Sequence, residues 1–197
     1  MTNKYKPFNF NRWIDMNRHL LKPPVGAKTL FEESGSFMIF VVGGPNKRRD
    51  FHYNETEEFF YQLEGNMTLQ IREEDGTRVD VPINEGEIFL LPAKVLHSPQ
   101  RKANTVGLVV EVKRPGTKDA VFWYCDNCGN ELYSTTYQFD QIGTELSPVL
   151  EKVHASDELR TCKNCGPLLV ISVARRLCTA GSYPPREAAQ VTTCATF

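Results

Sequence analysis

Two histidines and a glutamate have the residue types and the spacing of a metal site. Glu58 closely follows His52, and His97 lies in a separate segment. Two neutral imidazoles and one carboxylate form the facial triad that holds Fe(II) and leaves the opposite positions open for a substrate and O2. A lone histidine is more often a turn or strand residue than a ligand, but Glu58 adjoins the apolar run Phe59–Tyr61, where a carboxylate needs a partner. We therefore predict that His52, Glu58 and His97 bind a catalytic metal ion.

Four of the six cysteines form two Cys-x-x-Cys pairs, Cys125 with Cys128 and Cys162 with Cys165. Each such turn places two thiolates on one metal ion, and two turns complete a tetrahedral four-sulfur site. Disulfides are the alternative, but paired cysteines in a cytosolic protein favour a metal. A closed site of this kind has no vacant position, so we expect a structural role. Both Fe and Zn fit the pattern.

The composition argues against several other functions. The 197 residues carry a net charge of −1, and 41% of them are hydrophobic, which suits one domain or one domain with a small appendage. A nearly neutral chain has no general attraction for nucleic acid or an anionic membrane, and no segment has the roughly 20 apolar residues that span a bilayer. Residues 1–10 lack the apolar core of a signal peptide. We expect a cytoplasmic protein that binds neither nucleic acid nor membrane.

The first half of the sequence has the pattern of an all-β domain. Met67–Ile71 alternates between apolar and polar residues, as a half-buried strand does, and Asp75-Gly76 predicts a hairpin turn. Many short strands without helical crossovers indicate a sandwich or barrel. One helix is expected before the strands, at 11–21, and Pro23-Pro24 ends it. Strands are expected at 37–42, 58–63, 67–71, 78–81, 87–91 and 106–112.

The character of the sequence changes after Arg114-Pro115-Gly116. A run of three aromatic residues at 122–124 leads into the first cysteine pair, and one helix is expected within 141–154. Residues 168–197 have little periodicity and include Pro184-Pro185, so they are expected to be a loosely ordered tail. The two cysteines in this tail, Cys178 and Cys194, are interpreted as ordinary thiols.

The spacing of the metal residues resembles the two motifs of the cupins. The matching residues are His52, Glu58 and Gly65 in the first motif and Gly86, Pro92 and His97 in the second. Asn54 stands where the first motif usually has another histidine, which leaves three protein ligands. The resemblance implies a cupin-type double-stranded β-helix, or jelly-roll barrel, over residues 1–115. A rubredoxin-like four-cysteine appendage would follow at 116–167, and the tail at 168–197.

Three longer segments are similar to the 3-hydroxyanthranilate dioxygenase family: residues 21–26 (LKPPVG), 43–65 (GGPNKRRDFHYNETEEFFYQLEG) and 90–101 (LLPAKVLHSPQR). The similarity covers roughly residues 5–167, and the cysteine pairs resemble those of the microbial members. It implies an Fe(II) enzyme that uses O2 to open the ring of 3-hydroxyanthranilate, giving 2-amino-3-carboxymuconate semialdehyde on the kynurenine route to quinolinate and NAD. It also implies a homodimer.

The same resemblance assigns roles to residues around the metal. It implies that Arg101 binds the substrate carboxylate through a bidentate fork. Glu111 would bind the substrate and share a proton with it, or orient the arginine, and Glu58 would contact the substrate as well as the metal. Arg48 is expected to face the O2-binding side, where a cation stabilises developing negative charge. Ala27 stands where a polar residue is expected near the pocket.

Other functions stay open on the residues alone. A non-enzymatic cupin, either a small-molecule sensor or a metal-storage module, would have no polar groups around the metal beyond its ligands. A cupin isomerase or zinc hydrolase would also use two histidines and a glutamate. Metal dependence separates these enzymes from a dioxygenase, because Zn(II) cannot transfer electrons to O2. The cysteine pairs alone suggest a zinc-ribbon nucleic-acid binder, which the charge balance does not support.

Overall fold

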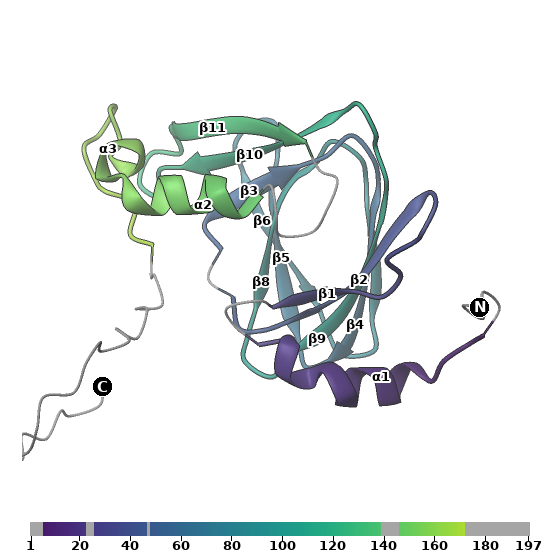
Figure 1. Ribbon diagram of the computed structural model, residues 1–197. Coiled ribbons are helices and arrows are strands. Elements are labelled where there is room, and N and C mark those ends of the chain that lie inside the picture. Colours follow the sequence, from purple (N-terminus) through teal and green to yellow (C-terminus); the bar gives the residue numbers. More distant parts are fainter. Residues whose placement is uncertain (1–5, 23–25, 47, 139–145, 172–197) are drawn as a thin grey trace, which may run out of the picture.

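The computed structural model describes residues 6–22, 26–46, 48–138 and 146–171 (Figure 1). Two antiparallel sheets face each other and form the all-β, cupin-type barrel that the strand pattern predicted. One sheet has five strands in the order β1 (Ala27–Thr29), β2 (Phe37–Gly43), β9 (Val106–Val112), β4 (Glu58–Glu64) and β7 (Ile88–Leu91). The other has six, in the order β11 (Glu131–Gln138), β10 (Lys118–Tyr124), β3 (Asp50–Tyr53), β8 (Leu96–Arg101), β5 (Met67–Arg72) and β6 (Arg78–Ile83).

The main core lies between the two sheets. Alternate residues of β5 are buried, because successive side chains of a strand point to opposite faces. The opposite sheet contributes Phe60 from β4 and Val109 from β9, which pair across the two strands. The buried members of this cluster are Met38, Phe40, Phe60, Met67, Leu69, Ile71, Ile83, Leu91 and Val109.

One amphipathic helix packs on the outside of the five-stranded sheet. Helix α1 (Phe10–Asn17) begins at Asn9, whose side chain accepts a hydrogen bond from the Arg12 N–H. A short 3₁₀ helix, Arg18–Leu20, follows it, so the predicted helix at 11–21 forms in two parts. Ile14 is buried in a second cluster with Leu21, Val41 and Val106. Pro23-Pro24, the predicted stop signal, lies outside the described residues.

The C-terminal segment packs on the far end of the six-stranded sheet (Figure 1). Helices α2 (Leu146–Ala155) and α3 (Asp157–Arg160) lie next to β10 and β11. Val153 of α2 is fully buried against Trp123 of β10, in a third apolar cluster. The predicted helix at 141–154 is therefore present from residue 146, and its expected start is not among the described residues.

The sheet continues past residue 115, where the first domain was expected to end. Strand β10 is hydrogen bonded to β3, with Val121 opposite His52. The strands β10 and β11 thus extend the six-stranded sheet that contains β3. Within the expected tail, Leu169 and Ile171 are buried. Residues 172–197, with Cys178 and Cys194, lie outside the described part of the chain, and no helix of the described part is long and apolar enough to cross a membrane.

Candidate active site and metal centres

The three predicted metal ligands meet inside the barrel. His52 on β3 and His97 on β8 are cross-strand partners, and their ring centroids are 5.3 Å apart. Glu58 begins β4 on the opposite sheet, and its Oε2 lies 3.1 Å from His97 Nε2. One possible ligand atom from each residue lies within 4.8 Å of the others, and all three residues are buried. The structure therefore assembles a three-ligand site from residues of both sheets.

The neighbouring groups orient this cluster. His97 Nδ1 donates to the Val95 carbonyl at 2.9 Å, which leaves its Nε2 facing Glu58. Asn54 donates from Nδ2 to Glu58 Oε2 at 3.3 Å. The residue that replaces the usual second cupin histidine is thus buried beside the site and holds the carboxylate.

The protonation states of the ligands suit a divalent cation. Burial lowers the pKa of His52, which favours the neutral imidazole. Burial acts to raise the pKa of Glu58, but its interactions with His97, including a side-chain hydrogen bond, and with His52 and Arg48 lower the pKa overall. Neutral imidazoles and an ionised carboxylate are the forms that bind a transition metal, so the donor set fits such an ion.

Arg101 is a buried cation that forms no ion pair with a carboxylate among the described residues. It is 4% exposed, its Nη1 donates to Gln62 Oε1 at 3.1 Å, and its Nε has no hydrogen-bond partner among the described residues. Burial lowers its pKa to about 10, so it is still charged at neutral pH. Gly107 makes room for it, because a Cβ there would lie 2.6 Å from Arg101 Nη1. A buried, charged guanidinium with an unused donor is suited to bind an anionic group of a ligand.

Arg48 lies at the edge of the same site. Its guanidinium pairs with the buried carboxylate of Asp50, and Nε is 3.1 Å from Asp50 Oδ2. Burial acts to lower the pKa of Arg48, but Asp50 raises it, and Glu58 adds to the rise. Arg48 is therefore a fixed cation near the metal ligands. The sequence analysis did not anticipate that Asp50 holds it.

Glu111 lies on β9 opposite Glu58 in the strand register. It is 3% exposed, and its Oε2 accepts from Arg114 Nη2 at 3.1 Å. Burial and the nearby Glu58 carboxylate raise its pKa to about 8, against the effect of Arg114. This carboxyl group holds a proton at neutral pH and can donate or accept one near the metal ligands.

Three other residues of the site were not predicted. Asp119 at the start of β10 places Oδ2 3.0 Å from His52 Nε2, and Arg114 pairs with Asp119. The ring of Tyr137 on β11 stacks on His52, with centroids 6.2 Å apart. Asp119 and Tyr137 reach the site because β10 and β11 extend the six-stranded sheet, and Arg114 lies just after β9. An alternating strand pattern at 118–124 is the signal that could have found Asp119.

The four paired cysteines form a second cluster at the end of β10. Cys125 Sγ is 3.5 Å from Cys165 Sγ, and Cys128 Sγ is 3.6 Å from Cys162 Sγ. All four are free thiols rather than disulfides, two buried and two exposed. In both turns the glycine after the second cysteine has positive φ, 70° at Gly129 and 90° at Gly166, and its N–H donates to the carbonyl of the first cysteine. Four sulfurs so arranged fit one tetrahedral metal ion.

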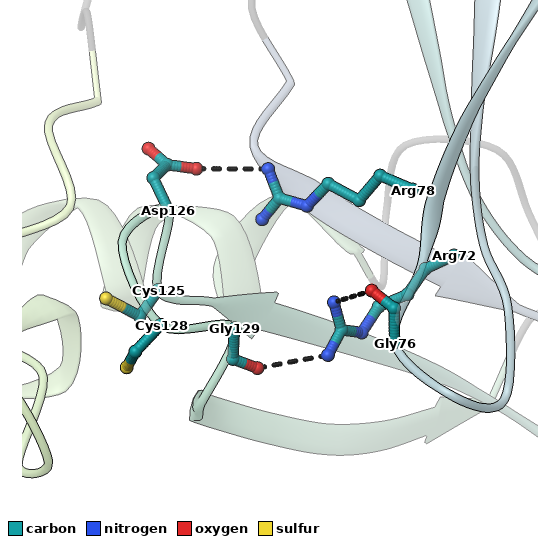
Figure 2. Close-up of a pocket in the computed structure, with 7 residues that line it drawn as sticks. All are labelled: Arg72, Gly76, Arg78, Cys125, Asp126, Cys128 and Gly129. Carbon is teal, nitrogen blue, oxygen red and sulfur yellow. Dashed lines mark hydrogen bonds and ion pairs between the residues drawn. The ribbon is translucent and has the colours of Figure 1, made fainter.

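Arg72 connects the first cysteine turn to the barrel (Figure 2). It extends from the end of β5, donates to the Gly76 carbonyl at 2.9 Å and to the Gly129 carbonyl at 3.0 Å, and lies 4.0 Å from the centre of the Tyr124 ring. Arg78 pairs with Asp126 in the same turn at 3.3 Å. These groups line a cavity of about 310 Å³ beside the cysteines. The cysteine site is thus attached to β5 and β6, and β5 pairs with β8, which carries His97.

Facing antiparallel sheets with a buried cluster of two histidines and one glutamate define a cupin-type metalloprotein. The chain belongs to the 3-hydroxyanthranilic acid dioxygenase family, whose sequence profile matches residues 1–154. It is 54% identical to the 3-hydroxyanthranilate 3,4-dioxygenase of Jannaschia sp. over 81% of this chain and 88% of the relative. It is 48% identical to that of Xanthomonas campestris pv. campestris over 81% and 90%. Among solved structures, it is similar to a cupin-2 domain containing protein from Shewanella frigidimarina, with 19% identity, 53% and 93% coverage and a TM-score of 0.43.

Proposed function

We propose that this protein is a 3-hydroxyanthranilate 3,4-dioxygenase, which uses O2 to open the aromatic ring and forms 2-amino-3-carboxymuconate semialdehyde, a precursor of quinolinate and NAD. Membership of the family and the enzyme names of its relatives support this activity. The structural observation that carries it is the three-ligand cluster together with the buried cation Arg101, whose charge interacts with that of Glu58. An aminophenol that carries a carboxylate has an amino and a hydroxyl group to bind the metal, and a carboxylate to bind Arg101.

Fe(II) is the proposed metal at His52, Glu58 and His97. When bound, it would supply the redox chemistry that O2 requires, with coordination positions left for the substrate. The buried, mixed imidazole and carboxylate donor set supports a transition metal, and the reaction itself requires one that can transfer electrons. A zinc hydrolase or isomerase on the same ligands would work equally well with Zn(II).

The chain's own residues would then orient the substrate. Arg101 would bind the carboxylate, since its Nε is free to donate and it forms no ion pair with a carboxylate among the described residues. Glu111 would exchange a proton with the bound substrate, because burial raises its pKa to about 8. Arg48, held by Asp50, would stabilise negative charge as it develops on oxygen. Glu58 would contact both the metal and the substrate.

Reconstitution tests this proposal directly. The protein is stripped of metal under anaerobic conditions and loaded with Fe(II) or Zn(II), and 3-hydroxyanthranilate and air are then added. We expect the absorbing semialdehyde product with Fe(II) only, and none from anthranilate, which lacks the second chelating group. Equal turnover with Zn(II) would support the hydrolase, and metal binding without any product would support the non-enzymatic cupin.

The cysteine cluster is proposed to hold one structural Fe or Zn ion, because four thiolates leave no position for a substrate. The two metals can be distinguished after purification, since a ferric four-thiolate site is coloured and a zinc site is not. A protein that contains neither metal in the cluster contradicts the proposal. Free thiols also support a cytoplasmic location, where cysteines stay reduced.

We also propose that the protein is a homodimer through the outer face of the five-stranded sheet. Phe59 and Val110 are cross-strand partners on this face, and Phe59 is also paired with Leu90 on the edge strand β7. Leu90 is 53% exposed and Ile88 is 65% exposed. An apolar row that crosses several strands is typical of a protein interface. The outward apolar residues are Phe37, Ile39, Phe59, Tyr61, Ile88, Leu90, Leu108, Val110 and Val112.

Sedimentation equilibrium tests this surface. The wild-type protein should have the mass of a dimer, and Leu90→Glu should shift it to a monomer at micromolar concentration. Val170→Glu is a matched control, because Val170 is 75% exposed on the C-terminal segment. A monomeric wild-type protein, or a Leu90→Glu variant that is still fully dimeric, would rule out this interface.

A further inference from the structure

Arg114 is a buried arginine with a dense set of contacts. It follows β9, is 7% exposed, and donates from Nη1 to Thr56 Oγ1 and to the Val112 carbonyl, both at 2.8 Å. Its Nε and Nη2 form a two-pronged contact with Asp119, at 3.1 and 2.7 Å. Nη2 also donates to Glu111 Oε2 at 3.1 Å. The planar guanidinium thus has partners on three sides.

These contacts join the two functional ends of the site. On one side Arg114 holds Glu111, the carboxyl group proposed to exchange a proton with the substrate. On the other side it holds Asp119, whose Oδ2 lies 3.0 Å from Nε2 of the metal ligand His52. The resulting chain of contacts is continuous and runs through buried atoms only, from Glu111 through Arg114 and Asp119 to His52.

We infer that Arg114 is a positioning residue that fixes the substrate-facing carboxyl group and the His52 imidazole relative to each other. This inference rests on the proposed function for the role of Glu111, and on the ligand cluster for that of His52. When a group that orients a metal-binding histidine is removed, the affinity for the metal commonly falls by roughly 10- to 100-fold. Arg114 differs from a group that orients only a histidine, because its one side chain contacts Glu111 and, through Asp119, also acts on His52.

The residue type matters because only a guanidinium has this geometry. Its donors lie in one plane at fixed angles, so it can contact Asp119 through two nitrogens and Glu111 at the same time. A lysine has a compact charge without a fork and cannot keep all these contacts. Arg114→Lys would therefore preserve the charge among the buried carboxyl groups while it loosens their positions. Asp119→Asn, in contrast, retains the guanidinium and its contact with Glu111, and it alters the group that links Arg114 to His52.

The test compares Arg114→Lys and Asp119→Asn with a control, Arg160→Lys. Arg160 is also a largely buried arginine, with an aspartate and a backbone carbonyl as partners, but it lies in the C-terminal segment. Mn(II) affinity is measured by the loss of the free-ion EPR signal, since this ion favours the imidazole and carboxylate site over thiolates. KM and kcat for 3-hydroxyanthranilate are measured on iron-loaded protein, and thermal melting on all variants.

We expect Arg114→Lys to weaken Mn(II) binding about tenfold and to raise KM by a similar factor. Asp119→Asn should weaken Mn(II) binding but leave KM within about twofold, and Arg160→Lys should lower only the melting temperature. A result in which Arg114→Lys loses thermal stability like the control, with unchanged Mn(II) affinity and KM, would overturn the inference. If the wild-type protein has no turnover, the proposed function fails, and the Mn(II) titrations still decide whether Arg114 positions His52.

Discussion

The two metal-binding clusters of this protein are built in opposite ways. Two of the three ligands of the first cluster, His52 and His97, lie on paired strands, and all three are buried. The ligands of the second lie on two turns, and Cys128 and Cys165 are exposed. Buried charged side chains lie beside the ligands of the first cluster, whereas backbone hydrogen bonds hold the two turns of the second.

This difference separates a reactive site from a structural one. Three ligands leave coordination positions open, and we propose that the charged groups Arg48, Arg101 and Glu111 orient the molecules that bind there. Four thiolates complete a tetrahedron and need only turns of the right shape. Strand β10 and Arg72 connect the two clusters, but the clusters are not equivalent. Removal of a ligand from one cluster should therefore have a different consequence from removal of a ligand from the other.

Removal of one ligand from the first cluster should have the largest effect. His97→Ala leaves two ligands, so we expect turnover to fall by at least about a thousandfold, because metal binding itself is lost. Metal analysis should find the cysteine cluster still loaded. Wild-type turnover in this variant would contradict the comparison of the two clusters, because His97 would then not be a ligand.

Removal of one ligand from the second cluster should affect stability instead. Cys162→Ser should lower the free energy of unfolding by about 3 kcal/mol, because a structural metal contributes binding energy to folding. Turnover per bound iron should stay within about twofold, as measured at a temperature where the variant is folded. Cys178→Ser is the matched control, since Cys178 belongs to neither pair. A variant that melts normally but has lost turnover would reverse the roles assigned to the two clusters.

A smaller effect is expected from Gly107→Ala, which adds one methyl group beside Arg101. The new Cβ would lie 2.6 Å from Arg101 Nη1 and 3.0 Å from Gln62 Oε1, so the guanidinium must move. We expect KM to rise roughly tenfold, which corresponds to about 1.4 kcal/mol of lost binding, with less change in kcat. Gly35→Ala is the control, because no atom lies within 4 Å of its added Cβ. An unchanged KM would show that Arg101 does not bind the substrate.

The last prediction concerns the pH dependence of stability in metal-free protein. Because burial raises the pKa of Glu111 from 4.5 to about 8, the folded protein holds a proton there that the unfolded chain releases. This group alone makes stability fall as pH rises from 4.5 to 8. The lowered pKa of His52 acts in the opposite direction, since the unfolded chain binds its proton below about 6.5.

Glu111→Gln isolates the first of these two contributions. Urea unfolding at pH 5.5 and pH 8.5 should show that the variant gains up to about 3 kcal/mol of stability relative to wild type over this interval. The same change in both proteins would mean that Glu111 ionises at its ordinary pKa.

Most of the apolar strands could be predicted from the sequence, whereas two of the strands that carry the site, β3 and β8, could not. The expected strands at 67–71 and 106–112 match β5 and β9 because side chains alternate between core and solvent. Strands β3 and β8 were not predicted, since polar groups such as Asp50, His52 and Arg101 face inward and disturb the pattern. Functional residues are the places where a sequence departs from the local rule.

The metal ligands were predictable, but their supporting contacts were not. His52, Glu58 and His97 fall within two short motifs, whereas Asp119 lies 67 positions from His52 in sequence and contacts it only through sheet pairing. Arg114 was noted only as part of a chain break, because nothing in its neighbourhood indicates burial. Such contacts depend on which strands become neighbours, and that information is spread over the whole chain.

The positions of the three ligands also have a mechanical consequence. Glu58 belongs to one wall of the barrel and the two histidines to the other, so a bound cation cross-links the walls from within. The melting temperature of the whole barrel should then rise with the concentration of free metal. At a metal concentration of a hundred times the dissociation constant, the added free energy of unfolding is about 2.7 kcal/mol. Chelation would let the walls separate, and amides of β4 and β8 should exchange with solvent faster.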